Sequence, residues 1–242
     1  MSTFDGDVQI LEKIQETPTK KSYLFIRPND FDFQPGQFVV ISLSRFSGAI
    51  MDSFRQFSIS SSPRDNYVSI TTQIIGRNSA FKDFLDSLSP GDSVRLSGPS
   101  GSFTMGDNTH RVALLAGGVG VTPFRSMIRH LAETSFSGEI RLLHSSRTYE
   151  ETLFYHEIKD IQAKVQWLKV YRFMTRETKK MEGVINGRMS TDYLRSIVVP
   201  FNPDECLISG PPSFVETINK VLVSELKLDP FKIKMERFEG YK

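Results

Sequence analysis

The stretch Arg111–Met127, RVALLAGGVGVTPFRSM, predicts a strand, a turn and a helix in immediate succession. Its first part, Val112–Ala116, is a continuous apolar run, which a strand buried on both faces requires. Gly117–Gly120 follows with three glycines, which let the backbone turn tightly and lie bare of side chains. Thr122 is a suitable N-cap and Pro123 a suitable first helical residue, so a helix is expected to begin here.

Such a unit of strand, turn and helix is a candidate anion site, because free N–H groups and the helix dipole both point at the turn. It can equally be a tight packing corner that binds no ligand. The spacing that starts at Gly118 is G-x-G-x-x-P, which ends in a proline and differs from the G-x-G-x-x-G of the dinucleotide-binding fold.

Composition narrows the class of protein. A chain of 242 residues can form one large or two modest domains, and 39% hydrophobic with 24% charged residues is ordinary for a soluble globular protein. The net charge of +2 is too small to indicate a nucleic acid or a membrane surface as partner. The first ten residues lack the basic and apolar segments of a signal peptide, and no apolar run approaches the length of a membrane span. We therefore expect a soluble, cytoplasmic protein.

Cysteine and histidine usage excludes two kinds of site. Cys206 is the single cysteine, so the chain cannot form an intrachain disulfide or hold a four-cysteine iron–sulfur cluster alone. The four histidines show no metal-ligand spacing, and no metal site is expected.

Up to about Phe103 the chain alternates short β-rich runs with turns that contain Pro, Gly, Asn and Asp, which is typical of a small antiparallel barrel. The expected strands are Val8–Gln15, Ser22–Arg27, Phe38–Leu43, Arg55–Ser60, Tyr67–Ile75 and Ser93–Leu96. One helix interrupts them, because Ser79 precedes a run whose apolar residues share one helical face.

Beyond about Asp107, strands alternate with helices, as in a parallel sheet. The strands expected after the opening unit are Ile140–His144, Val165–Val170, Glu205–Ile208 and Ile233–Met235, and the helices are Pro123–Glu133, Glu150–Ile161, Ser190–Ile197 and Ser213–Leu226. The predicted fold is an antiparallel Greek-key β-barrel over residues 1–106, followed by an α/β domain with a parallel sheet over residues 107–242.

Two stretches of the barrel have residue types suited to chemistry. In Arg55–Ser58, RQFS, the guanidinium can grip a phosphate by two bonds, and the aromatic and the hydroxyl can meet a planar ring. In Gly76–Ser79, GRNS, the N–H groups at a helix start can bind an anion. Taken singly, the first also suits an ordinary strand and the second a plain helix cap.

Five motifs occur in a fixed order along the chain. They are R-x-F-S at Arg55, G-R-N-S at Gly76, G-P-S-G-S-F at Gly98, G-G-V-G-V-T-P at Gly117 and S-G-P-P at Ser209. In this order they resemble the ferredoxin–NADP reductase family of flavoenzymes. The resemblance implies an FAD-binding barrel, a nicotinamide-nucleotide domain, hydride transfer from NAD(P)H to the flavin, and one-electron transfer to a separate small redox protein, which is a ferredoxin, a flavodoxin or an oxygenase component.

The resemblance also implies roles for individual residues. Arg55 holds the flavin diphosphate, Phe57 packs on the isoalloxazine, and Ser58 hydrogen-bonds near N5. Glu236 lies near the nicotinamide, and the ring of Phe238 covers the flavin. The implied FAD ligands are Arg55, Gln56, Phe57, Ser58, Thr72, Gln73, Gly76, Arg77, Asn78, Ser79 and Phe238.

The nicotinamide-nucleotide ligands implied by the resemblance belong to the second domain. They are Gly118, Gly120, Val121, Thr122, Pro123, Ser145, Ser146, Arg147, Gly210, Pro211 and Pro212. Ser58, Glu236 and Ser209 are the residues implied at the reacting centre. Ser209 stands where the family has a cysteine, which puts a thiol role in doubt, and Cys206 reads as a buried structural thiol.

The second parallel strand ends in Ser145, Ser146 and Arg147, while the acids come later, at Glu150 and Glu151. An arginine at this place accepts a 2′-phosphate, which favours NADPH over NADH, although NADH-using relatives also carry one. Three other functions stay open: an electron-transfer subunit of a larger oxidoreductase or oxygenase complex, an NADH-dependent reductase of free flavin or cytochrome, and a binding module without redox activity. The chain ends without a cysteine-rich tail, which argues against the first.

Overall fold

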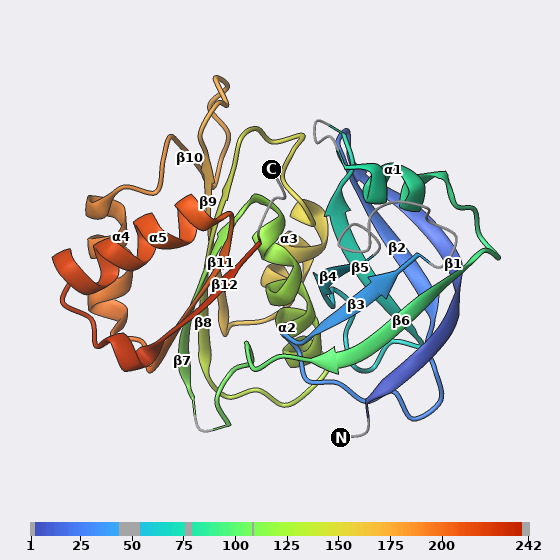
Figure 1. The fold of residues 1–242 in the computed structure, drawn as a ribbon. Coiled ribbons are helices and arrows are strands. Elements are labelled where there is room, and N and C mark those ends of the chain that lie inside the picture. The colour runs from blue at the N-terminus through green and yellow to red at the C-terminus, as the bar shows by residue number, and fades with distance from the viewer. Residues whose placement is uncertain (1–2, 44–53, 76–78, 108, 239–242) are drawn as a thin grey trace.

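The chain folds into two parts that pack side by side, and each part is built on a six-stranded sheet (Figure 1). The structure is a computed structural model, and it describes residues 3–43, 54–75, 79–107 and 109–238. None of the helices in these ranges is long and apolar enough to cross a membrane.

The N-terminal sheet is antiparallel, with the strand order β4-β3-β6-β1-β2-β5. Its strands are β1 (Phe4–Thr17), β2 (Lys20–Ile26), β3 (Phe38–Ser42), β4 (Phe54–Ser58), β5 (Tyr67–Gln73) and β6 (Ser93–Ser100). A bridge between Ile59 and Ile70 joins the two edges, β4 and β5, and closes the sheet into a barrel. Alternate residues such as Tyr23 and Phe25 point inward and are fully buried.

The helix of the barrel, α1 (Ala80–Ser87), begins where the sequence predicts it. The Ser79 hydroxyl accepts a hydrogen bond from the Lys82 amide at 3.4 Å and so caps the helix. Phe81 and Leu85 lie on its buried face and complete the barrel core.

The C-terminal sheet is parallel, with the order β10-β9-β8-β7-β11-β12. Its strands are β7 (Arg111–Gly117), β8 (Glu139–Ser146), β9 (Leu168–Met174), β10 (Val184–Asn186), β11 (Glu205–Gly210) and β12 (Ile233–Arg237). The central strand β7 is buried on both faces, as its apolar run predicts: Leu114 contributes to one hydrophobic core and Leu115 to the other.

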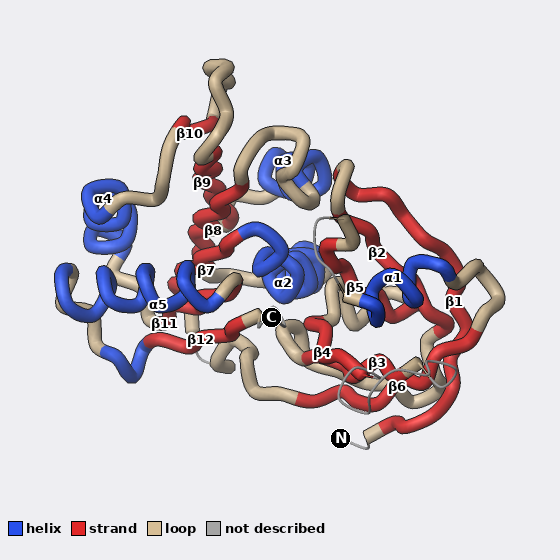
Figure 2. Tube along the Cα trace, turned by 45° about the horizontal axis from the view of Figure 1, so that its top comes forward, coloured by secondary structure: helices blue, strands red, loops and turns tan. Residues whose placement is uncertain are grey.

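Helices cover both faces of this sheet (Figure 2). They are α2 (Thr122–Ala132) and α3 (Tyr155–Lys164) on the side of the barrel, and α4 (Thr191–Phe201) and α5 (Pro212–Lys220) on the other side. The predicted fold, a barrel followed by a parallel α/β domain, is confirmed.

Several predicted helix and strand boundaries are wrong. Thr122 is not an N-cap: a 3₁₀ turn over Gly118–Val121 winds directly into α2, and Val121 occupies the cap position without a side-chain hydrogen bond. Helix α3 begins at Tyr155 rather than near residue 150, because Phe154 adopts a left-handed backbone conformation with φ of 56°. Strand β9 begins at Leu168, three residues after the predicted 165.

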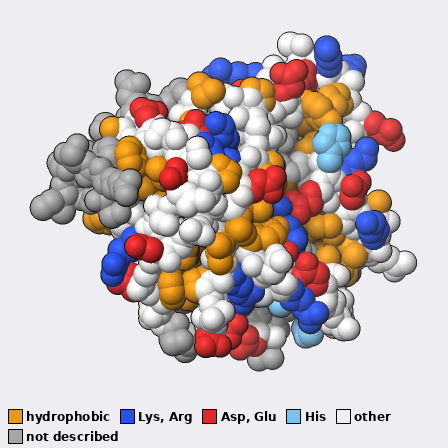
Figure 3. Space-filling model, turned by 90° about the vertical axis from the view of Figure 1, so that its right-hand side faces the viewer, with side chains coloured by type: hydrophobic (Ala, Val, Ile, Leu, Met, Phe, Trp, Pro, Cys, Tyr) orange, Lys and Arg blue, Asp and Glu red, His pale blue; other side chains and the backbone are white. Residues whose placement is uncertain are grey.

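The connection between the two sheets runs from Ser100 to Arg111, and the proposed domain boundary after residue 106 falls within it. On the outer face of the barrel, acidic and basic side chains are intermixed (Figure 3). This distribution agrees with a net charge of only +2 for the whole chain.

Candidate functional site

A cleft of about 940 Å³ lies between the barrel and the carboxyl ends of the parallel strands. Strands β4 and β5 and the start of α1 line it from the barrel, while the ends of β7, β8 and β12 line it from the second domain. The carboxyl ends of strands beside a topological switch point are where open α/β sheets bind ligands, and here the order reverses at β7, between β8 and β11. The volume suits a bound cofactor.

Three predicted residues meet at one carboxylate in this cleft. Ser58, the last residue of β4, donates a hydrogen bond to Glu236 Oε2 at 2.9 Å. Ser209 on β11 donates to the same oxygen at 3.4 Å, because β11 and β12 pair in a register that places Ser209 beside Glu236. Side chains from two strands of the second domain and one strand of the barrel therefore form a single hydrogen-bonded cluster.

The environment of Glu236 changes its acidity. Burial raises the pKa of Glu236 to about 7, while the hydrogen bonds from Ser58 and Ser209 act in the opposite direction. A carboxyl group with a pKa near neutrality can hold or release a proton at Oε2 under physiological conditions.

The barrel side of the cleft carries the predicted R-x-F-S motif. Arg55 is only 7% exposed, and its Nη1 donates to the Phe54 carbonyl at 2.7 Å. Its guanidinium lies 5.2 Å from the ring centroid of Phe81, and Phe57 packs against the same ring. Lys82 Nζ donates to the Gln73 carbonyl at 3.1 Å and ties the start of α1 to β5.

The glycines of the turn after β7 differ in their surroundings. Gly118 lines the cleft with φ of +55°, and a Cβ added there would meet nothing within 4 Å. Gly120 packs under β11 instead, because its Cβ would lie 2.1 Å from the Ser209 carbonyl oxygen. Gly118 therefore offers bare backbone to a ligand, and Gly120 allows the turn to approach the strand that carries Ser209.

Most of the predicted site residues come together in this cleft. Those that line it are Arg55, Gln56, Phe57, Ser58, Thr72, Gln73, Ser79, Gly118, Thr122, Ser145, Ser146, Arg147, Pro211, Glu236 and Phe238. Those that lie beneath or beside its lining are Gly120, Val121, Pro123, Ser209, Gly210 and Pro212. Gly76, Arg77 and Asn78 lie outside the described residues, as does the more distal Tyr241.

Sequence reasoning missed a further group of cleft residues. They are Lys20, Phe38, Phe54, Thr71, Lys82, Gly117, Val119, Glu151, Thr175, Phe214, Met235 and Arg237. Met235 and Arg237 flank Glu236 in sequence, so the prediction of Glu236 could have been extended to both of them. Lys20 comes from the barrel and Glu151 from the turn after β8, and no local pattern marks either of them.

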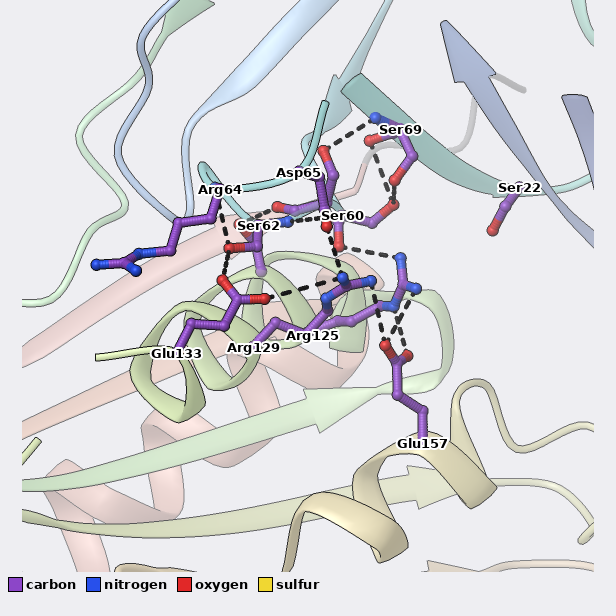
Figure 4. Close-up of polar contacts among 12 residues, drawn as sticks. Ser22, Ser60, Ser62, Arg64, Asp65, Ser69, Arg125, Arg129, Glu133 and Glu157 are labelled. Carbon is purple, nitrogen blue, oxygen red and sulfur yellow. Dashed lines mark hydrogen bonds and ion pairs between the residues drawn. The ribbon is translucent and has the colours of Figure 1, made fainter. Parts of the chain in front are cut away.

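Two arginines of α2 hold the barrel and the second domain together (Figure 4). Arg125 donates to the Ser60 carbonyl at 3.1 Å, and its Nε and Nη2 donate to Glu157 of α3 at 2.6 and 3.2 Å. One turn later, Arg129 Nη2 donates to Asp65 at 2.7 Å. We call these contacts the α2 clamp.

Hydroxyl groups complete the same interface. Ser126 Oγ donates to the Ser61 carbonyl at 2.6 Å, and Ser62 Oγ donates to the Glu133 carboxylate. The serine run that follows Ser58 thus supplies carbonyl and hydroxyl groups to one helix, and Ser61, Ser62 and Ser126 are fully buried. The α2 clamp therefore fixes the segment that presents Ser58 to the cleft.

Comparison with known proteins agrees with this geometry. Residues 114–220 match the family model described as the oxidoreductase NAD-binding domain. The chain is 29% identical over 224 residues to the glycine betaine monooxygenase reductase subunit of Chromohalobacter salexigens, and 28% identical over 237 residues to the flavohemoprotein of Bacillus subtilis. These alignments cover 90% and 95% of this chain.

Solved structures match both domains together. The flavohem-like FAD/NAD-binding domain of nitric oxide dioxygenase from Vibrio cholerae superposes with a TM-score of 0.83 at 25% identity, over 97% of this chain and 99% of that one. A ferredoxin–NADP⁺ reductase from Neisseria gonorrhoeae has the same fold, with a TM-score of 0.79 at 17% identity over the full length of both chains. The matched NAD-binding domain and the fold shared with these structures support the resemblance to the ferredoxin–NADP reductase family that the sequence motifs indicate.

The chain spans only part of the length of the curated relatives that it matches. It covers 60% of the Chromohalobacter protein and 58% of the Bacillus protein. Within the described residues, no group of three or more His, Cys, Asp or Glu side chains is placed to hold a metal ion.

The α2 clamp predicts a stability difference between two arginine–carboxylate pairs. Replacing Arg125 with Met leaves Glu157 and the Ser60 carbonyl without this donor in a half-buried interface, which should lower the free energy of unfolding by about 2 kcal/mol. Arg95→Met is the matched control, because Arg95 pairs with Asp5 in two bonds at the exposed surface, where solvent screens the pair, and the substitution should change stability far less. Denaturant unfolding measures both, and equal losses would contradict a special role for the clamp.

The raised pKa of Glu236 predicts a pH-dependent stability. The folded state binds the Glu236 proton more tightly than the unfolded state, so this group contributes stability at low pH that is lost as the pH rises towards about 7. Between pH 5 and 8 the contribution should fall by about 2 kcal/mol. In Glu236→Gln this loss should disappear, whereas Glu216→Gln, at an exposed position of α5, should behave like the wild type. Unfolding curves across this pH range test the assignment, and an unchanged pH dependence in Glu236→Gln would refute it.

Proposed function

We propose that the chain is an FAD-containing reductase that takes electrons from NAD(P)H, preferring NADPH, and passes them singly to a separate redox protein in the cytoplasm. The observation that carries this proposal is the polar group formed by Ser58, Glu236 and Ser209, which joins the barrel to the carboxyl ends of β11 and β12 inside the cleft. It lies where a ring held by the barrel and a ring held by the second domain would meet.

The barrel half of the cleft fits a flavin dinucleotide. The buried guanidinium of Arg55 suits a diphosphate, and the capped start of α1 at Ser79 directs N–H groups to the same region. The aromatic side chains of Phe57 and Phe238 line the cleft and suit a planar ring system. Ser58 and the β5 residues Thr72 and Gln73 offer polar groups to the edge of that ring.

The other half fits a nicotinamide nucleotide. The open backbone at Gly118 leads into α2, whose N-terminus favours a diphosphate. Ser145, Ser146 and Arg147 line the cleft at the end of β8, where an adenosine ribose would lie, and the arginine favours a 2′-phosphate. Pro211 marks the start of α5 beneath the nicotinamide position.

When bound, the cofactors supply the redox chemistry, which is hydride transfer from the nicotinamide to the flavin. The side chains of this chain position and polarise the reacting groups. The Ser58 hydroxyl donates to ionised Glu236, and when Oε2 is protonated the direction of this hydrogen bond can reverse, which frees the hydroxyl proton for a ligand in the cleft. The Phe238 amide donates to the Gly210 carbonyl at 2.9 Å, which fixes the backbone of Phe238 beside the cleft that this residue lines.

Rapid mixing of the FAD-loaded protein with NADPH or NADH tests this function. Loss of the visible absorption band of the oxidised flavin should be fast with one or both nucleotides, and faster with NADPH. If the protein binds no flavin, or if neither nucleotide reduces the bound flavin, the proposed function is refuted. The description of the fold is unaffected by either result.

The identity of the acceptor is a separate part of the proposal. The Chromohalobacter relative is named as the reductase subunit of a monooxygenase, and this likeness supports an oxygenase component as acceptor alongside a ferredoxin or a flavodoxin. A second candidate function follows from the same name: the chain acts as the reductase unit of a larger oxygenase assembly. Co-purification of a stable complex would favour this candidate over a free-standing reductase.

Ser58→Ala should slow flavin reduction about tenfold while FAD remains bound, because the variant lacks the hydroxyl that links Glu236 to the flavin edge. Ser87→Ala on the exposed face of α1 is the control. Single-turnover reduction measures the rate, and flavin absorbance of the desalted protein measures occupancy. Unchanged reduction kinetics in Ser58→Ala would remove this role.

Arg147→Ala should weaken NADPH binding about tenfold and NADH binding much less, because only NADPH carries the 2′-phosphate that the guanidinium would grip. Arg176→Ala is the control: its backbone amide donates to the Arg147 carbonyl, but its side chain does not line the cleft. Titration of both nucleotides measures the difference. An equal loss for NADPH and NADH would count against the preference for NADPH.

A further inference from the structure

Lys20 crosses from the barrel to the second domain at the floor of the cleft. It begins β2, and its side chain is only 5% exposed. Its Nζ donates to the Glu151 carbonyl at 3.2 Å and lies 3.7 Å from Glu151 Oε2. Both residues line the cleft, so this contact between the domains faces the space where a nucleotide would bind.

The surroundings of Lys20 are rich in positive charge. Burial lowers the pKa of the Lys20 ammonium, Glu151 raises it, and the nearby Arg147 lowers it further. Behind these groups, His144 bonds to the Gly118 carbonyl at 3.2 Å, and burial lowers its pKa to about 4, so it is neutral at pH 7. Two cations thus face one carboxylate at the wall of the cleft.

The geometry of the contact between Lys20 and Glu151 would allow another anion to replace the Glu151 carboxylate. Its carboxylate distance of 3.7 Å exceeds that of a hydrogen bond, whereas the bond from Lys20 goes to a backbone carbonyl. The Glu151 side chain is 29% exposed and belongs to the turn between β8 and α3, so it can move into solvent without disturbing a helix or strand.

We propose that Lys20 is a phosphate ligand of the nicotinamide nucleotide, contributed by the barrel, and that Glu151 is the carboxylate that the phosphate displaces. The inference rests on the proposed function and deepens it. A phosphate placed between Lys20 and Arg147 would gain two charge-assisted contacts from two different domains, one of them from a largely buried ammonium group. The barrel would then contribute to the choice and affinity of the nucleotide as well as holding the flavin.

Lys21 provides a matched control in the neighbouring position. Because β2 alternates, Lys21 points to the opposite face, where its Nζ pairs with Asp86 at 2.7 Å. Lys21 does not line the cleft. The substitutions Lys20→Met and Lys21→Met therefore remove the same charge from adjacent positions of one strand.

The test is equilibrium titration of the FAD-loaded full chain with NADP⁺ and NAD⁺ by calorimetry, which reads binding rather than turnover. Lys20→Met should lose about tenfold in affinity or more, the equivalent of one charge-assisted hydrogen bond. A loss confined to NADP⁺ identifies the 2′-phosphate as the group bound, and an equal loss for both nucleotides identifies the diphosphate; either supports the proposal. Wild-type affinity in Lys20→Met, or an equal loss in Lys21→Met, overturns it.

Glu151→Gln separates a ligand from a structural ion pair. If a phosphate displaces Glu151, this variant should bind the affected nucleotide more tightly than the wild type. If the pair only holds the domains together, Glu151→Gln should weaken both nucleotides as Lys20→Met does, and this result overturns the proposal. A wild-type protein that binds flavin but neither nucleotide would instead refute the proposed function itself, and the proposal with it.

Discussion

The geometry of the cleft depends on the α2 clamp, in which Arg125 and Arg129 join α2 to the barrel. The N-terminus of the same helix follows the glycine turn at Gly118, so one rigid element both carries the turn and binds the barrel. On the barrel side, the clamped serine run begins two residues after Ser58. The bonds that hold the domains together therefore also set the distance between Ser58 and the second domain.

The unusual acidity of Glu236 is a consequence of this arrangement. Its carboxylate is largely buried on β12 beside Ser209, and contact with the barrel adds the bond from Ser58. Separating the domains would expose the carboxyl group and return its pKa towards the ordinary range. The proton affinity of Glu236 thus depends on the packing of the two domains as well as on the residues of its own domain.

The sequence was sufficient for the fold because its decisive signals are local. The apolar run of β7, the glycines after it and the cap at Ser79 act within a few residues of chain, and the ordered motifs contain many of the residues that line the cleft. The helix start at Thr122 was misjudged because a 3₁₀ turn can replace a capping side chain. Lys20, Glu151 and Arg125 could not be found in this way, because each acquires its role from a partner more than thirty residues distant in a different element.

The α2 clamp and the contact between Lys20 and Glu151 both join the two domains, but they differ in how firmly their cations are held. Arg125 donates two hydrogen bonds to Glu157 of its own domain, the shorter at 2.6 Å, and a third bond across the interface to the Ser60 carbonyl, so an anion could bind Arg125 only by displacing these partners. Lys20 faces its carboxylate at 3.7 Å on the wall of the open cleft. A contact of the first kind maintains the relative position of the domains in every state of the protein. If Lys20 binds the nucleotide as proposed, a contact of the second kind would be exchanged for the ligand while the first still holds the domains in place, and the nucleotide would bind across the interface of a protein that is already assembled.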